Sequence, residues 1–156
     1  MYHYPEKWSI NLYGSIHMKY LLDTCVISEL VKSKPDKKVV SRIRKNDEDD
    51  LCLSSLTFGE LYKGIAKLPD STRREKLSHW IEHDLKERFA GKIFAVDRPV
   101  AKTWGEIQGA SETAGNPMPA IESLIAAIGL TDNLIVVTRN VAGMRQSGLT
   151  LLNPWE

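Results

Sequence analysis

Short apolar runs alternate with longer amphipathic segments along this chain of 156 residues. The apolar runs have the length of buried strands, and the amphipathic segments place apolar residues three and four positions apart, as a helix requires. Strands that alternate with helices form parallel sheets, because each helix returns the chain to the edge where the previous strand began. The sequence therefore predicts one α/β domain with a parallel sheet covered by helices on both faces.

The same pattern gives boundaries for the elements. We expect strands at residues 18–22, 51–54, 93–96 and 134–138, and a short edge strand at 150–152. We expect helices at residues 24–31, 35–46, 57–68, 71–89, 99–113 and 119–130, the last of them buried because it is apolar on nearly every side. A clean apolar strand begins only at Met18, so we interpret residues 1–17 as an N-terminal extension and residues 18–156 as the domain.

The charge balance and the cysteines limit the classes of protein that fit. The 21 basic and 20 acidic residues nearly cancel, so any contact with nucleic acid must come from local patches. Cys25 and Cys52 are too few for a disulfide framework, and residues 1–17 lack the continuous apolar core of a signal peptide. No apolar run has the length of a membrane span. These features predict a cytoplasmic protein.

Three acidic residues follow strand ends or open helices. Asp23 follows the first strand, Glu60 lies one turn after the second, and Glu122 is in the first turn of the buried helix. Ligands of open parallel sheets bind beyond the carboxyl ends of the strands, so these carboxylates should meet there and suit Mg²⁺ or Mn²⁺. Each acid also has a structural interpretation. Asp23 suits an N-cap, Glu60 has the spacing of a capping box with Thr57, and Glu122 suits a helix dipole.

Four ordered segments of the chain carry a resemblance to a known family. They read LLDTCVISEL, LSSLTFGELYKGIAKL, GNPMPAIESLIAAIGL and LIVVTRNVAGM, and the chain ends in LTLLNPW. Together they resemble the motifs of PIN-domain ribonuclease toxins of the VapC family, in the FitB-like branch, from Met18 to Trp155. The resemblance implies a three-layer α/β/α PIN-like domain with a central parallel sheet of four to five strands.

The resemblance also implies an activity and partners. Proteins of this family are Mg²⁺- or Mn²⁺-dependent endoribonucleases that act as toxins of type II toxin–antitoxin systems. We therefore expect an RNA substrate, a homodimer and a VapB-like antitoxin, with operator DNA contacted only through the antitoxin complex.

The family motifs assign roles to individual residues. Asp23, Glu60 and Glu122 match the catalytic acids. Asp23 and Glu122 would bind the metal directly, and Glu60 would orient the attacking water or bind a second ion. Supporting polar side chains match at Thr24, Ser28, Thr138, Arg139 and Asn140.

Two departures from the family pattern predict a weakened acidic site. The third acid is normally aspartate, and the extra methylene of Glu122 displaces the carboxylate by more than the ~0.5 Å that catalytic geometry tolerates. The fourth acid should fall at Gly143, which supplies no ligand. Asp132 precedes the fourth strand and should lie at the opposite end of the sheet, and Asp97 follows the third strand but should lie outside the cluster.

We therefore expect reduced or lost nuclease activity. The alternative is a catalytically inactive PIN-fold subunit that binds a VapB-like antitoxin and co-represses its operon. Cys25 also differs from the family, which prefers asparagine at that position.

Three other patterns in the sequence indicate alternative functions. Residues 79–83 fit the H-x-x-E-H pattern of a zinc peptidase class, although two exposed residues on a charged helix face are the simpler interpretation. Asp23 and Thr24 after a strand suit a phosphatase-type nucleophile, but Cys25 stands where such enzymes place a second acid. Basic stretches within residues 32–45 and 73–76 are either solvated faces or phosphate contacts beside the metal site.

Overall fold

A computed structural model describes residues 8–10 and 16–156 of the chain. Five strands form one sheet in the order β5-β4-β3-β6-β7, and all neighbouring pairs are parallel. The strands are β3 (Tyr20–Leu22), β4 (Leu51–Ser54), β5 (Ile93–Phe94), β6 (Ile135–Val137) and β7 (Leu151–Leu152). The predicted parallel sheet, including its short edge strand, is confirmed.

Helices connect the strands at close to the predicted positions. They are α1 (Thr24–Leu30), α2 (Lys37–Arg44), α3 (Ser55–Ala66), α4 (Thr72–His79), α5 (Lys86–Arg88), α6 (Arg98–Thr113), α7 (Ala120–Thr131) and α8 (Val141–Met144). A π-helical segment, η2 (Trp80–Leu85), joins α4 to α5, and short 3₁₀ turns occur at η1 (Glu48–Asp50) and η3 (Arg145–Ser147). The helix predicted over residues 71–89 is thus one continuous run with a π segment inside it.

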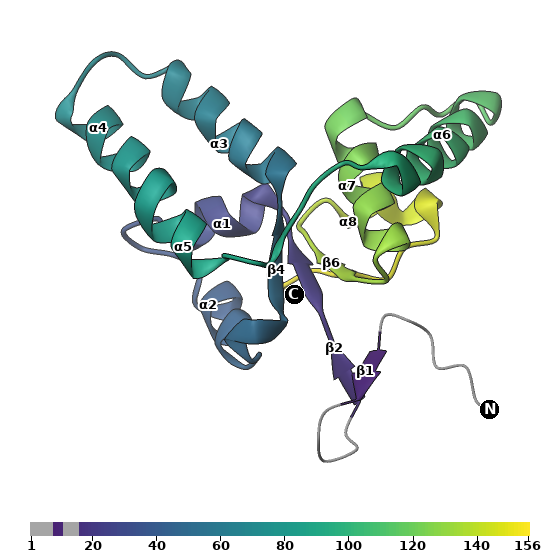
Figure 1. The fold of residues 1–156 in the computed structure, drawn as a ribbon, viewed down its shortest axis with the longest axis horizontal. Coiled ribbons are helices and arrows are strands. Elements are labelled where there is room, and N and C mark those ends of the chain that lie inside the picture. The colour runs from purple at the N-terminus through teal and green to yellow at the C-terminus, as the bar shows by residue number, and fades with distance from the viewer. Residues whose placement is uncertain (1–7, 11–15) are drawn as a thin grey trace.

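The two faces of the sheet bury different hydrophobic clusters. Leu21, Cys52 and Val136 pack against α6 and α7, whereas their neighbours Leu22 and Val137 pack on the opposite face against α1, α2 and η2. This alternation is the period of two that a strand buried on both faces imposes. Figure 1 shows the two groups of helices on either side of the strands. The three-layer α/β/α architecture is confirmed.

The first predicted strand is divided in the structure. Met18 belongs to β2 (Ile16–Met18), which pairs antiparallel with β1 (Trp8–Ile10) in a separate two-stranded ribbon. The strand of the main sheet begins two residues later, at Tyr20. The prediction that one strand spans residues 18–22 was therefore wrong. The remaining residues of the expected N-terminal extension, 1–7 and 11–15, lie outside the described residues.

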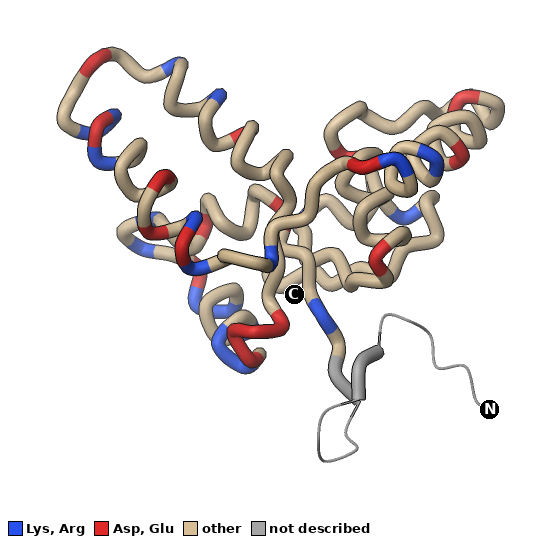
Figure 2. The backbone as a smooth tube through the Cα atoms, in the orientation of Figure 1, with Lys and Arg blue, Asp and Glu red and all other residues tan. Residues whose placement is uncertain are grey.

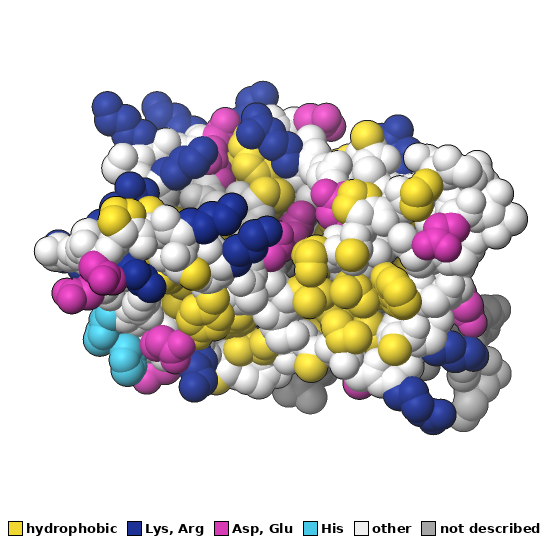
Figure 3. All heavy atoms as spheres, turned by 90° about the horizontal axis from the view of Figure 1, so that it is seen from above, with side chains coloured by type: hydrophobic (Ala, Val, Ile, Leu, Met, Phe, Trp, Pro, Cys, Tyr) yellow, Lys and Arg dark blue, Asp and Glu magenta, His cyan; other side chains and the backbone are white. Residues whose placement is uncertain are grey.

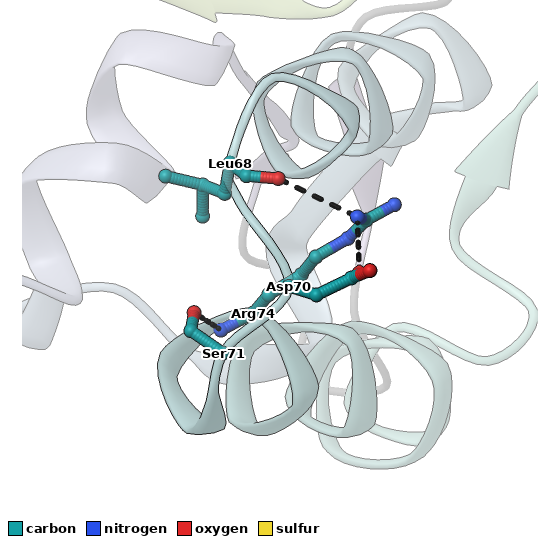
Figure 4. Close-up of polar contacts among 4 residues, drawn as sticks. All are labelled: Leu68, Asp70, Ser71 and Arg74. Atoms are coloured by element: carbon teal, nitrogen blue, oxygen red, sulfur yellow. Dashed lines mark hydrogen bonds and ion pairs between the residues drawn. The ribbon is translucent and has the colours of Figure 1, made fainter.

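A compact turn holds α4 against α3. The guanidinium of Arg74 donates to the carboxylate of Asp70 over 2.7 Å and to the backbone carbonyl of Leu68 over 3.4 Å, and Ser71 caps α4 by accepting from the Arg74 backbone N–H (Figure 4). One of the three basic residues in the 73–76 stretch therefore has a structural role. Within the described part of the chain, no helix is both long and apolar enough to cross a membrane.

Gly129 lies where α7 packs most closely on the sheet. A methyl group added there would lie 2.8 Å from Cγ2 of Val136 and 2.9 Å from Cδ1 of Leu149. Overpacking of this kind costs about 1–3 kcal/mol, partly offset by the better helix propensity of alanine. We predict that Gly129→Ala lowers the free energy of unfolding by about 1–2 kcal/mol in urea denaturation followed by circular dichroism.

A matched control is available in the neighbouring helix. Gly105 in α6 has open space around the position of a methyl group. Gly105→Ala should leave the free energy of unfolding unchanged or raise it by up to ~1 kcal/mol. Equal destabilisation by the two variants would contradict the close packing of α7 on β6.

Candidate active site

Asp23 joins the end of β3 to the start of α1 and is buried, with 9% of its surface exposed. One carboxylate oxygen, Oδ1, accepts the backbone N–H of Thr24 over 2.8 Å and caps α1. The other, Oδ2, accepts the hydroxyl of Thr138 over 2.8 Å, at the end of β6. The N-cap interpretation is thus correct for one oxygen, while the second joins the two central strands at their carboxyl ends.

Glu60 approaches the same edge from α3. Its Oε1 accepts the hydroxyl of Thr24 over 2.6 Å, and Thr24 Oγ1 also lies 3.2 Å from the hydroxyl oxygen of Thr57. The capping box of Thr57 and Glu60 was a wrong prediction, because α3 begins at Ser55 and Ser54 caps it by accepting from the Leu56 N–H. Glu60 is therefore not used to cap its own helix, and its carboxylate is directed to α1.

The end of β6 supplies the third side of the site. Besides donating to Asp23, the Thr138 hydroxyl accepts the backbone N–H of Asn140 over 3.0 Å. Asn140 caps α8, and its Oδ1 accepts the N–H of Gly143 over 3.3 Å. A Cβ atom at Gly143 would lie 2.7 Å from that same Oδ1. Any side chain at position 143, aspartate included, must therefore displace the Asn140 amide from its present position.

Glu122 reaches the same edge of the sheet from α7. It lies in the first turn of α7, and because α7 ends just before β6 begins, that turn lies toward the carboxyl ends of the strands. Its side chain is half-buried. Within residues 8–10 and 16–156, no three His, Cys, Asp or Glu side chains gather closely enough to hold a metal ion. Hydrogen bonds connect two of the three predicted acids, Asp23 and Glu60, which share Thr24 as a partner.

The two other acids considered in the sequence, Asp97 and Asp132, interact with each other electrostatically. Asp97 caps α6 by accepting from the Val100 N–H over 3.0 Å. Burial raises the pKa of Asp132, and the negative charge of Asp97 raises it further. Asp97 and Asp132 are therefore electrostatic neighbours of each other, although the sequence placed them at different ends of the sheet. Thr103 on α6 contacts Thr131 at the end of α7, which brings the start of α6 toward Asp132.

Cys25 places a thiol beside the buried carboxylate. Its Sγ lies 3.7 Å from Asp23 Oδ2 and 3.8 Å from the Thr138 hydroxyl oxygen. Burial raises the pKa of the Cys25 thiol, and the charge of Asp23 acts in the same direction. The thiol therefore remains protonated at neutral pH and acts as a weak donor to Asp23.

The C-terminal tryptophan was not predicted as part of the site's surroundings. The ring of Trp155 lies beneath the guanidinium of Arg139, with 4.9 Å from Cζ to the ring centroid. Trp155 also donates to Glu29 on α1, whose pKa is lowered mainly by its hydrogen bond with Lys32. Arg139, predicted as a supporting residue, has its backbone beside Cys25 and its guanidinium over Trp155. The only signal in the sequence was the aromatic residue at the end of the family-like motif.

Basic side chains are distributed unevenly around the site. Figure 3 looks down on the carboxyl edge of the sheet and shows acidic side chains near its middle, with Lys and Arg on the side of the first helices and hydrophobic side chains over α6 and α7. In the 32–45 stretch, Lys32 pairs with Glu29. The C-terminal end of α2 leads through η1 into the start of β4, so its basic residues lie toward the opposite edge of the sheet (Figure 2). For the C-terminal end of the 32–45 stretch, this position favours a solvated helix face over a phosphate contact beside the acids.

A groove of about 320 Å³ opens beside the acids, where Thr24, Ser28 and Glu60 form one end of it. Its walls come from α1, α3, α4 and η2 and are mostly apolar: Val31, Leu61, Gly64, Ile65, Leu68, Arg73, Leu77, Trp80 and Ile81. Ser28 thus lines the groove one turn after Thr24 and does not contact Asp23 through any hydrogen bond found in the described residues.

The donor atoms of this cluster fit a hard divalent cation. Asp23 and Glu60 contribute carboxylates, and Thr24 and Thr138 contribute hydroxyl oxygens. Mg²⁺ is commonly bound in proteins through one or two carboxylates while it keeps several water ligands. Asp23 and Glu60 together supply that number of carboxylates, although the number of protein ligands is small.

Comparison with known proteins identifies the family. The PIN-domain family model matches residues 20–144. The plasmid stability protein StbB of Pseudomonas syringae pv. tomato is 35% identical over 136 residues, which cover 87% of this chain and 98% of StbB. The toxin FitB of Neisseria gonorrhoeae is 33% identical over 86% of this chain and 97% of FitB. The crystal structure of FitAcB from Neisseria gonorrhoeae aligns with a TM-score of 0.83 and 32% identity, covering 88% of this chain and 99% of that one. This chain therefore belongs to the PIN-domain family, in its VapC-type branch.

Proposed function

We propose that this chain is the toxin of a type II toxin–antitoxin system, a Mg²⁺- or Mn²⁺-dependent endoribonuclease of the VapC kind whose acidic site is weakened. The observation that carries the proposal is the cluster of Asp23, Thr24, Glu60 and Thr138 at the carboxyl edge of a PIN-type sheet. Relatives support the reaction class, since a protein 31% identical over 87% of this chain is the VapC ribonuclease Y4jK of Sinorhizobium fredii.

Each residue of the cluster has a defined task in this proposal. Asp23 and Glu122 would hold the metal directly, and Glu60 would orient the attacking water or hold a second ion. A divalent ion held there supplies the positive charge that eases the attack of water on a phosphodiester. Thr138 fixes the orientation of Asp23 by donating to Oδ2, and Thr24 fixes Glu60 by donating to Oε1.

The weakening follows from the two acids that depart from the family pattern. Gly143 contributes no carboxylate, and Asn140 Oδ1 is occupied with capping α8. Glu122 has the longer side chain and is not gathered with Asp23 and Glu60 among the described residues. Ligand number governs how tightly a protein holds a hard cation, so a site with fewer carboxylates should bind Mg²⁺ less tightly.

The same observation favours a second function. If too few ligands remain for catalysis, the chain acts as an inactive PIN-fold subunit that binds a VapB-like antitoxin and co-represses its operon. Several solved structures similar to this one are toxin–antitoxin complexes, and one is FitAB bound to a DNA fragment. We propose the same arrangement here: a cytoplasmic homodimer that reaches operator DNA only through the antitoxin.

The groove beside Glu60 is the surface that we assign to the antitoxin. Its apolar walls suit the hydrophobic face of a partner helix, and its acidic end suits a basic partner side chain. A partner seated there would cover Thr24 and Glu60 and exclude RNA from the acids. Antitoxin binding would then itself block RNA cleavage.

Metal affinity should depend on the acids at positions 122 and 143. We predict that the E122D/G143D variant binds Mg²⁺ or Mn²⁺ about tenfold more tightly than the wild-type chain in titration calorimetry, a difference of ~1.4 kcal/mol. Gly143→Ala is the matched control, because it also displaces the Asn140 amide but adds no carboxylate. Equal affinity of the wild-type chain and E122D/G143D would show that the departures are harmless and the site is not weakened.

Expression without an antitoxin separates the two functions. We predict that the wild-type chain slows growth of a bacterial host and that Asp23→Asn relieves the effect, because asparagine retains an oxygen for the α1 cap but loses the charge. The readout is the growth rate after induction, with the protein level measured on blots. If the wild-type chain has no effect and E122D/G143D arrests growth, the inactive-subunit function holds and the endoribonuclease function fails.

Antitoxin binding should depend on the apolar wall of the groove and not on the acids. We predict that Ile65→Asp lowers affinity for the cognate antitoxin at least about tenfold, since a buried unpaired carboxylate is costly, while the Asp23→Asn variant still binds. Val96→Asp, at a partly exposed position outside the groove, is the control. Unchanged binding by Ile65→Asp in a pull-down titration would exclude the groove as the interface.

A further inference from the structure

Two histidines form a close pair on the surface, away from the acidic cluster. The ring centroids of His79 and His83 lie 4.3 Å apart with an angle of 38° between the ring planes. Both residues are exposed, and the pair is visible at the edge of the molecule in Figure 3. They are four positions apart at the junction of α4 and η2, so they project from the same face of one helical run.

The helix beneath the pair is held rigidly. Ile81 and Leu85 of η2 are buried in the core, and the turn made by Asp70, Ser71 and Arg74 fixes the start of α4. The hydroxyl of Tyr62 on α3 donates to the carboxylate of Glu82, between the two histidines in sequence. The two imidazoles are therefore presented by a fixed backbone, and a bound ion would not have to order the segment first.

The hydrogen bonds leave the imidazoles available as ligands. No hydrogen bond or ion pair to either ring is found in the described part of the chain, and a neutral imidazole is the commonest protein ligand of transition metals. The Glu82 carboxylate accepts a hydrogen bond from Tyr62, and within the described residues no third His, Cys, Asp or Glu supplies the third protein ligand that a zinc peptidase requires. The pair therefore suits metal binding without peptidase chemistry.

We propose that His79 and His83 form a binding site for a divalent transition-metal ion of the Zn²⁺, Ni²⁺ or Cu²⁺ class. Two imidazole nitrogens select these ions over Mg²⁺ and Mn²⁺, which prefer oxygen ligands. Within the described residues, no third His, Cys, Asp or Glu completes the site, so water fills the remaining positions and the ion exchanges readily. The site is chemically distinct from the carboxylate cluster at Asp23 and Glu60.

The test is a calorimetric titration of the untagged full chain with ZnCl₂. We expect one Zn²⁺ ion per chain at this site, and both His79→Gln and His83→Gln should weaken binding about tenfold or more, since the loss of even an indirect metal contact costs that much. Asp23→Asn is the control for the acidic cluster and should bind Zn²⁺ as the wild-type chain does. Far-UV circular dichroism confirms that each surface variant keeps the fold.

Each other outcome overturns the proposal. Absence of Zn²⁺ binding by the wild-type chain excludes the site. Retained affinity in both histidine variants, or loss of affinity only in Asp23→Asn, assigns any bound Zn²⁺ to other residues. As a second measurement, Ni²⁺ should raise the melting temperature of the wild-type chain and not that of His79→Gln, because a ligand that binds only the folded form stabilises it.

Discussion

The hydrogen bonds of the Asp23 carboxylate join three elements at the centre of the fold. One oxygen caps α1 and the other accepts from Thr138 at the end of β6, so β3, β6 and α1 meet at one buried group. A buried carboxylate is costly unless its oxygens are satisfied, and here both are. The same two central strands supply the core faces that pack α7 on one side and α1 on the other. Asp23 thus contributes both to the candidate active site and to the joining of β3, β6 and α1.

Because of this double role, the presence of an acid at the site does not by itself indicate catalysis. Asp23 caps a helix and Glu60 links α3 to α1 through Thr24, so both carboxylates stabilise the fold whether or not RNA is cleaved. At the two positions where we expect a departure from the family pattern, Gly143 joins this network only through its backbone N–H, which donates to Asn140 Oδ1. Glu122 is not a hydrogen-bond partner of Asp23 or Glu60 in the described residues. A carboxylate that caps or links helices therefore contributes to the stability of the fold as well as to any catalysis.

Much of the fold could be predicted from the sequence, because strand and helix periods are local properties. The five parallel strands required no knowledge of contacts, whereas their order in the sheet, β5-β4-β3-β6-β7, came only from the structure. Local spacing gave a wrong capping prediction for α3, because another capping side chain lies one turn earlier in the chain. Ser54 caps α3, the role predicted for Thr57 and Glu60, so the Glu60 carboxylate is free to accept from Thr24. Contacts between distant segments, such as Arg139 on Trp155, could not be derived from local spacing.

In the loop after β6, position 143, where the family pattern places a fourth acid, is coupled to Asn140. Asn140 places its side-chain oxygen where a Cβ atom at position 143 would lie, and that oxygen caps α8 by accepting from the Gly143 N–H. Glycine at 143 and the present orientation of Asn140 are therefore mutually dependent. An aspartate there would move the asparagine, and through the Asn140 N–H it would reach the Thr138 hydroxyl that orients Asp23. A substitution at position 143 is therefore coupled to Asp23 through Asn140 and Thr138.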